Sequence, residues 1–127
     1  MQDGPLAYSV EFEDRSTYAF ARISAPKIDR EMAFSYLSEI VMKCADIRRK
    51  KLLLERDIPG LMNDSDMSLA MAKLLSMGSG MKIAILNRNP GLGEALEKAM
   101  NSACTSDSNC GYFNDFEEAE RWLMASA

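Results

Sequence analysis

Histidine is absent from the 127 residues of this chain, and its absence removes several kinds of site at once. Histidine supplies the usual general base near neutral pH and is the commonest ligand of transition metals. Catalytic triads built on histidine and most zinc sites are therefore excluded. No other pairing of a nucleophile with a base is recognisable, so we expect a protein that is not an enzyme and that uses no cofactor or metal.

Long apolar runs are also missing. No segment approaches the roughly 20 residues that a membrane-spanning helix needs, and residues 1–5 lack the basic and apolar segments of a secretory signal. The net charge of −4 disfavours nucleic acid and anionic lipid surfaces, because both select a concentrated basic face. We therefore expect a cytoplasmic protein without a membrane span or a nucleic-acid partner.

Cysteine is scarce, with three residues in the chain. Cys44 falls on the apolar side of a predicted helix, where a thiol usually serves as a small buried hydrophobe. Cys104 and Cys110 are near enough in sequence to pair across a loop, but a reducing cytoplasm favours free thiols. The sequence predicts free thiols and leaves open whether the last two ever pair.

The N-terminal part of the chain predicts a hairpin followed by a helix. Tyr8, Val10 and Phe12 alternate with polar residues, the period of a strand with one buried face, and residues 17–24 form a second strand. Asp29 is placed to cap a helix. That helix carries apolar residues at the 3.6-residue period: Met32, Ala33, Tyr36, Leu37, Ile40, Val41 and Cys44.

The rest of the chain repeats one module, a short apolar run followed by a capping residue and a helix. The apolar runs are residues 52–54, 83–86 and 112–113, within strands predicted at 52–55, 81–86 and 110–113. Strands that are apolar on every residue have both faces covered. The helices that follow are capped by three sets of residues: Asp64 or Ser65, Asn89 before Pro90, and Asp115.

These elements define an α/β fold in the order β-β-α-β-α-β-α-β-α. We expect one domain, residues 1–127, with a single mixed five-stranded sheet and four helices. With 47% hydrophobic residues the chain suits a single core. In such sheets, ligands and partners meet the carboxyl ends of the parallel strands.

Residues 112–123, with the sequence YFNDFEEAERWL, resemble the last strand and helix of the SpoIIAA-like proteins in the STAS family of anti-sigma-factor antagonists. The element order of nearly the whole chain is similar to that family as well. The resemblance implies a STAS fold and a bacterial signalling protein that binds another protein, such as a regulatory kinase.

The resemblance also implies a phosphorylation site. In the antagonists an Asp-Ser pair begins the second helix and a partner kinase phosphorylates the serine, and Asp64 and Ser65 occupy the matching place. A phosphate there would meet unpaired amides and the positive end of the helix dipole. The family pattern continues with a small residue and a glycine, where this chain has Asp66 and Met67. The alternative is that Asp64 and Ser65 only cap the helix.

Methionine is abundant around the same predicted helix. Met67 and Met71 lie four residues apart, and unbranched thioether chains adapt to variable partners. We therefore predict a partner-binding surface that includes Asp64, Ser65, Met67 and Met71, with ordinary core packing of the methionines as the alternative.

Two further candidate sites lie near the carboxyl ends of the predicted strands. Five polar residues are expected to cluster there, either around a shared proton or hard cation or simply as turn formers and caps: Glu55, Asp57, Asp64, Asn87 and Asn89. The amides near Asn89, Gly91 and Gly93 are candidates for binding an anion, although the spacing matches neither the dinucleotide fingerprint nor a phosphate-binding loop.

The leading hypothesis is thus a non-enzymatic regulatory or protein-interaction module that docks through its second helix. The SpoIIAA-like resemblance also permits an alternative, a carrier or sensor that holds an apolar or lipid-like small ligand between sheet and helices. A homodimer through the second helix or through the hairpin edge, residues 8–13, is a third expectation.

Overall fold

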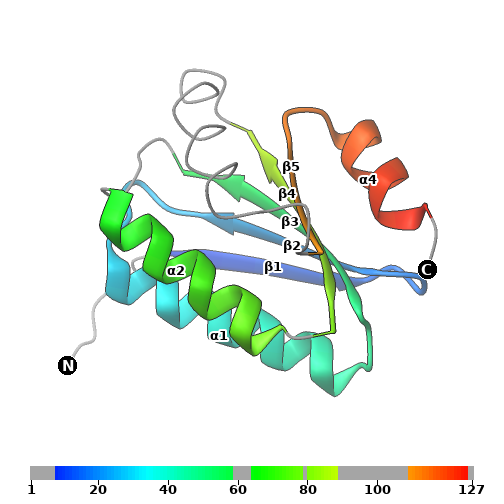
Figure 1. Ribbon diagram of the computed structural model, residues 1–127, viewed down its shortest axis with the longest axis horizontal. Coiled ribbons are helices and arrows are strands. Elements are labelled where there is room, and N and C mark those ends of the chain that lie inside the picture. Colours follow the sequence, from blue (N-terminus) through cyan, green and yellow to red (C-terminus); the bar gives the residue numbers. More distant parts are fainter. Residues whose placement is uncertain (1–7, 59–63, 79, 89–108, 126–127) are drawn as a thin grey trace.

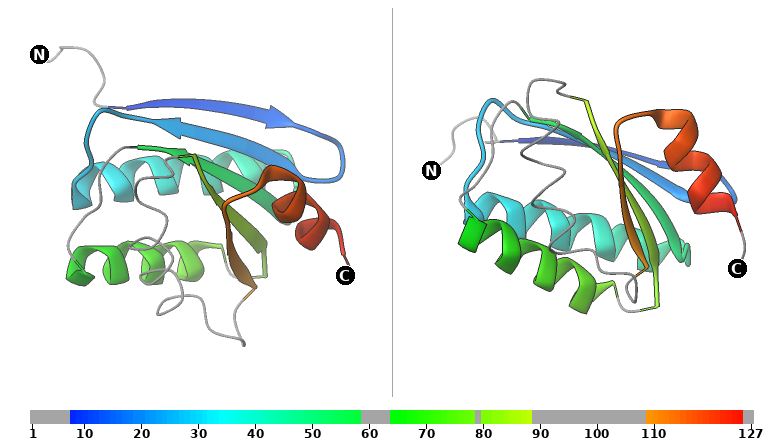
Figure 2. Two further views of the ribbon diagram at one scale, coloured as in Figure 1. Left: turned by 90° about the horizontal axis from the view of Figure 1, so that it is seen from above. Right: turned by 45° about the horizontal axis from the view of Figure 1, so that its top comes forward.

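The computed structural model describes residues 8–58, 64–78, 80–88 and 109–125, apart from the side chains of five residues in the second helix. One sheet runs through this part of the chain with helices on both of its faces (Figure 1, Figure 2). The strands are β1 (Ser9–Asp14), β2 (Ala19–Ser24), β3 (Lys51–Asp57), β4 (Lys82–Asn87) and β5 (Cys110–Phe113). The helices are α1 (Arg30–Asp46), α2 (Asp64–Met77) and α4 (Phe116–Met124).

The sheet has the order β1-β2-β3-β4-β5. β1 pairs with β2 in antiparallel orientation, and the other three pairs are parallel. The predicted mixed five-stranded α/β sheet is therefore confirmed, with β3 at its centre. The described residues contain three helices; the fourth one predicted, after Asn89, falls outside them.

Capping side chains begin two of the helices where the sequence predicts them. The Asp29 carboxylate accepts a hydrogen bond from the Met32 amide at 2.8 Å, and the Asp115 carboxylate accepts one from the Glu118 amide at 2.9 Å. Each satisfies an amide that the first helical turn leaves without a partner. α2 differs from the prediction, because Asp64 and Ser65 already lie in its first turn instead of preceding it.

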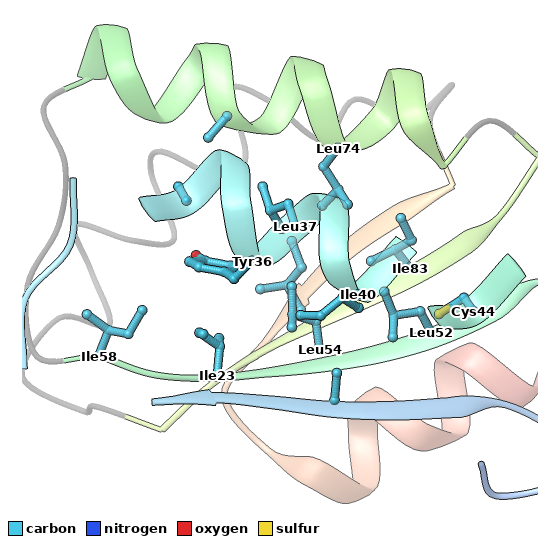
Figure 3. Packing of buried hydrophobic residues seen from close by; sticks show 14 of the residues in the cluster. Ile23, Tyr36, Leu37, Ile40, Cys44, Leu52, Leu54, Ile58, Leu74 and Ile83 are labelled. Atoms are coloured by element: carbon cyan, nitrogen blue, oxygen red, sulfur yellow. The ribbon is translucent and has the colours of Figure 1, made fainter. Parts of the chain in front are cut away.

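The larger core lies between the sheet and the two helices α1 and α2, which cover the same face (Figure 2, Figure 3). Side chains from alternate strand positions point into it because successive residues of a strand face opposite ways. The fully buried large residues of this core are Ile23, Ile40, Leu52, Ile58, Leu74 and Ile83.

A smaller core lies on the opposite face beneath α4. Leu53 and Leu123 have no exposed surface there, and the tilted rings of Phe113 and Trp122 pack with their centroids 5.4 Å apart. The Lys82 ammonium closes the end of α4 by donating to the carbonyl oxygen of Trp122 at 2.7 Å. Burial on both faces explains the consecutive apolar residues 52–54 of β3 and 83–86 of β4.

The cysteines divide into two kinds. Cys44 is free and fully buried on α1, as predicted. Cys110, the first residue of β5, is disulfide-bonded, so the prediction of a free thiol is wrong at this position. That prediction depended on an assumed reducing compartment, which the sequence of the chain does not establish. Cys104 falls outside the described residues.

Burial of Cys44 predicts a loss of stability at alkaline pH. Burial raises the pKa of the Cys44 thiol to about 11, whereas an exposed thiol in an unfolded chain ionises near ~8.5. Between these values the unfolded state binds fewer protons than the folded state, so stability falls as pH rises. We expect the free energy of unfolding to fall by about 1 to 2 kcal/mol more in the wild type than in Cys44→Ala between pH 8 and pH 10.5.

Urea unfolding at both pH values measures this difference. Buried tyrosines titrate in both proteins and cancel in the comparison. Equal losses of stability in the two proteins would show that Cys44 ionises as readily in the folded state as in the unfolded state.

Candidate functional site

The carboxyl ends of β2, β3 and β4 lie at one edge of the sheet, and α1 and α2 begin at the same edge (Figure 1, Figure 2). Two helix N-termini and three strand ends therefore meet here, the arrangement in which open α/β sheets usually bind ligands. The polar residues of this edge fall into two groups, one on each face of the sheet.

The first group lies on the face that carries α4 and is built around Glu55. The Glu55 carboxylate is buried, with 2% of the residue exposed, and forms an ion pair and hydrogen bond with Arg22 on the neighbouring strand. Arg88 approaches the same carboxylate at 3.9 Å, and Arg22 also approaches Glu11 at 3.6 Å. The hydrogen bond and charge of Glu55 raise the pKa of the Arg22 guanidinium.

The second group lies on the face covered by α1 and α2. Arg56 and Asn87 are register partners on β3 and β4, and each has 5% of its surface exposed. The Arg56 guanidinium donates a hydrogen bond to the Ile58 carbonyl oxygen at 2.9 Å. Burial lowers the pKa of Arg56, and Tyr36 on α1 lies near enough for its charge interaction with Arg56 to affect both pKa values.

The predicted cluster of acids and amides is therefore not one cluster. Glu55 and Asn87 lie on opposite faces of the sheet, because adjacent residues of a strand alternate in direction and Asn87 is the register partner of Arg56. Asp57 is exposed at the end of β3. The side chain of Asp64 and the whole of Asn89 fall outside the described residues, as do Gly91 and Gly93 of the predicted anion site. In the part of the chain that the structure describes, no three acidic or cysteine side chains are placed to hold a metal ion.

Sequence reasoning did not single out Arg22, Arg56 or Tyr36. An arginine within an apolar strand is the available signal for Arg56, because an arginine is rarely buried unless other groups stabilise its charge. Arg22 carries no comparable signal, since its place on β2 is equally suited to a solvated side chain.

The predicted partner surface on α2 is described in part. Ser65 is exposed in the first turn of the helix, and α2 begins at Asp64. The side chains of Met67 and Met71 fall outside the described residues, so their part in a surface stays a prediction.

α2 packs beside α1, and three pairs of side chains join the two helices among the residues whose side chains are described. Arg30 approaches Asp66 at 3.6 Å, and the Lys73 ammonium lies 5.3 Å from the centre of the Phe34 ring. The third pair is the hydrogen bond that the Ser38 hydroxyl donates to the Met77 sulfur at 3.4 Å. Asp66 and Lys73 are thus both engaged with α1.

The opposite side of α2 is exposed. We call this surface the outer α2 face and define it by four exposed residues at helical spacing: Ser65, Leu69, Ala72 and Ser76. Leu69 has 47% of its surface exposed, which is high for a leucine, and all four residues are uncharged. A solvated helix normally presents charged residues on this side.

Comparison with known proteins leaves the chain without an assigned family. No family model matches the sequence, and no curated protein matches it either. A search of the described helices for a membrane-spanning segment found none that is long and apolar enough.

Proposed function

We propose that this protein is a regulatory interaction module of the STAS type, without enzymatic activity, and that it binds a partner protein through the outer α2 face. The observation that carries the proposal is the exposed, uncharged surface formed by Ser65, Leu69, Ala72 and Ser76. Exposed apolar residues within a helix face that lacks charge are typical of surfaces that a partner covers.

The contacts of α1 and α2 support the proposal. Asp66 interacts with Arg30, and Lys73 interacts with Phe34, both on α1. A partner that covers the outer α2 face therefore need not desolvate the charge of Asp66 or of Lys73. Removing charges from water is the main cost of burying a polar surface. The outer α2 face therefore combines contact area with a low desolvation cost.

Ser65 gives this surface a means of regulation. Its hydroxyl is exposed in the first turn of α2, where a phosphate would meet helix amides. The same phosphate would bring two negative charges onto an uncharged surface and close to Asp66. The partner we propose is accordingly a protein of a regulatory system, with a kinase for Ser65 among its members, as the resemblance to the antagonists implies.

A charge placed on the outer α2 face tests the proposal. Leu69→Glu puts a carboxylate at the exposed leucine of this face, and we expect a loss of partner binding of tenfold or more. The measurement is affinity purification of the tagged protein from its native cells, with each co-purifying protein quantified. Intact-mass analysis of the same preparations reports a phosphate on Ser65.

Met42→Glu is the matched control. Met42 has 66% of its surface exposed on α1, so the same charge is introduced at an apolar residue outside the outer α2 face. We expect it to leave the co-purifying proteins unchanged, and both variants to keep the far-ultraviolet dichroism of the wild type. Recovery of the same proteins at the same level with Leu69→Glu would refute docking through this face. The other expectations from the sequence stay predictions: a cytoplasmic location, a homodimer and the binding of a lipid-like ligand.

A further inference from the structure

Four cations gather at the end of the sheet where β3 and β4 begin, opposite the edge at which α1 and α2 begin (Figure 1). Arg48 and Lys50 lie in the segment that joins α1 to β3, and both are exposed. Lys51 and Lys82 are register partners at the first residues of β3 and β4. We call these four residues the basic end.

The positive charge of the basic end is not offset by neighbouring acids. Arg49, which lies within the same run of cations, donates a hydrogen bond to the Asp14 carboxylate at 2.7 Å. By contrast, Arg48, Lys50 and Lys51 form no ion pair and no side-chain hydrogen bond with any residue that the structure describes. The basic end can therefore form ion pairs with a partner without first breaking any of its own.

Two of the cations are held side by side. Lys51 and Lys82 are register partners on adjacent strands, so their side chains lie on the same face of the sheet. Lys82 donates hydrogen bonds to the carbonyl oxygens of Trp122 and Ala125, both at 2.7 Å, which fix the position of its ammonium group. Burial and the charge of Lys51 lower the pKa of Lys82. Like charges beside each other on a sheet are destabilising, so a bound anion would relieve a repulsion that the free protein carries.

Capping of α1 does not account for these cations. A cationic side chain can stabilise the end of a helix by donating to carbonyl oxygens that have no partner. At the end of α1, the backbone amides of residues 47–49 already donate to the carbonyl oxygens of residues 43–45. The side chains of Arg48 and Lys50 are therefore not needed as caps.

We propose that the basic end binds an acidic segment of another protein, whose carboxylates form ion pairs with Arg48, Lys50 and Lys51. The net charge of the chain is −4, so the rest of the molecule is acidic on balance and repels a polyanion that extends beyond this end. Nucleic acid and anionic membranes present negative charge over a wider surface. A short acidic segment of a protein places its carboxylates at the basic end alone.

The proposal goes beyond partner binding by the outer α2 face, with which the basic end shares no residue. That face is uncharged and selects a partner by apolar contact, whereas the basic end selects one by charge. Leu69→Glu is therefore expected to leave binding at the basic end unchanged, and either proposal can fail without the other.

Binding of fluorescently labelled decaglutamate at physiological ionic strength tests the proposal on the whole chain. We expect Lys50→Glu to bind the peptide about fivefold more weakly or worse, because an attraction becomes a repulsion, and Lys50→Arg to bind it as the wild type does. Lys27→Glu is the matched control, since it makes the same change of charge at an exposed lysine between β2 and α1, at the other end of the sheet. We expect it to bind as the wild type does.

Duplex DNA and phosphatidylserine vesicles are the competing anions. Failure of the wild type to bind decaglutamate overturns the proposal and would mean that the basic end is only a solvated surface. Equal weakening by Lys50→Glu and Lys27→Glu overturns it too, because the net charge and not the basic end would then govern binding. Lys50-dependent binding of the DNA or the vesicles that is tighter than the binding of decaglutamate would replace the acidic segment by a nucleic acid or a membrane.

Discussion

Arg22→Met is expected to lower the free energy of unfolding by about 2 to 3 kcal/mol, as measured by urea denaturation at neutral pH. The substitution keeps most of the aliphatic stem that lies along the sheet and removes the guanidinium. What remains is the Glu55 carboxylate, 2% exposed and deprived of its hydrogen-bonded ion-pair partner. A buried charge without a partner is among the most costly features that a single substitution can create.

The two arginines beside Glu55 make unequal contributions, and Arg88→Met is the matched control. Its guanidinium is 3.9 Å from the Glu55 carboxylate, and its side chain is 55% exposed. Because Arg88 is half exposed and 3.9 Å from the carboxylate, we expect Arg88→Met to lower the free energy of unfolding by at most about 1 kcal/mol. Arg88 also explains why the loss in Arg22→Met stops short of the full cost of an isolated buried charge.

The double variant Arg22→Met with Glu55→Gln separates a lost attraction from a stranded charge. Glutamine removes the buried charge at nearly constant volume, so the double variant is expected to be more stable than Arg22→Met alone. If the double variant is less stable than the single one, the cost in Arg22→Met does not come from Glu55. If Arg22→Met lowers the free energy of unfolding by less than about 0.5 kcal/mol, the ion pair with Arg22 does not stabilise the buried carboxylate when the protein is in solution.

The fold could be predicted because each of its elements leaves a local pattern. The alternation at Tyr8, Val10 and Phe12 requires only neighbouring residues, and so do the caps at Asp29 and Asp115. The apolar run at residues 52–54 predicts a strand with both faces covered, and β3 contributes buried leucines to both cores. Each of these inferences draws on fewer than about 20 consecutive residues, which is the range over which periodicity acts.

The contacts between polar residues of neighbouring strands could not be predicted, because they depend on the register of the strands. Arg22 and Glu55 are register partners on β2 and β3, although 33 positions separate them in the chain. Nothing local to either residue fixes which residue of a parallel neighbour lies beside it. A shift of the register by one position would turn the Glu55 side chain to the face covered by α1 and α2, away from Arg22.

The different hydrogen bonding of the Tyr18 and Tyr36 hydroxyl groups could not be predicted from the sequence for a related reason. Tyr18 falls within the strand predicted at residues 17–24, and Tyr36 lies among the apolar residues of the predicted helix. Glu120, which accepts the hydrogen bond of the Tyr18 hydroxyl, is 102 positions away, on α4. Only the folded arrangement shows that the Tyr18 hydroxyl has this partner, whereas the Tyr36 hydroxyl has no hydrogen-bond partner among the described residues.

Two adjacent leucines of β3 provide the last prediction, which tests the position of this strand between two cores. Leu52 points into the core beneath α1 and α2, Leu53 points into the core beneath α4, and neither has exposed surface. Leu52→Ala and Leu53→Ala should each lower the free energy of unfolding by about 3 kcal/mol, because each leaves a cavity in packed surroundings. In urea denaturation the two variants are thus expected to look alike.

The fluorescence of Trp122 distinguishes them. Trp122 is the single tryptophan of the chain and packs against the core that contains Leu53, with its ring tilted against Phe113. Leu53→Ala should loosen α4 and shift the native emission to longer wavelength as water reaches the indole, whereas Leu52→Ala should leave the native emission unchanged. Because each variant is the control for the other, a shift in both or in neither would contradict the assignment of the two side chains to separate cores. A shift in Leu53→Ala alone means that one strand supports two independently packed layers, as its unbroken apolar run requires.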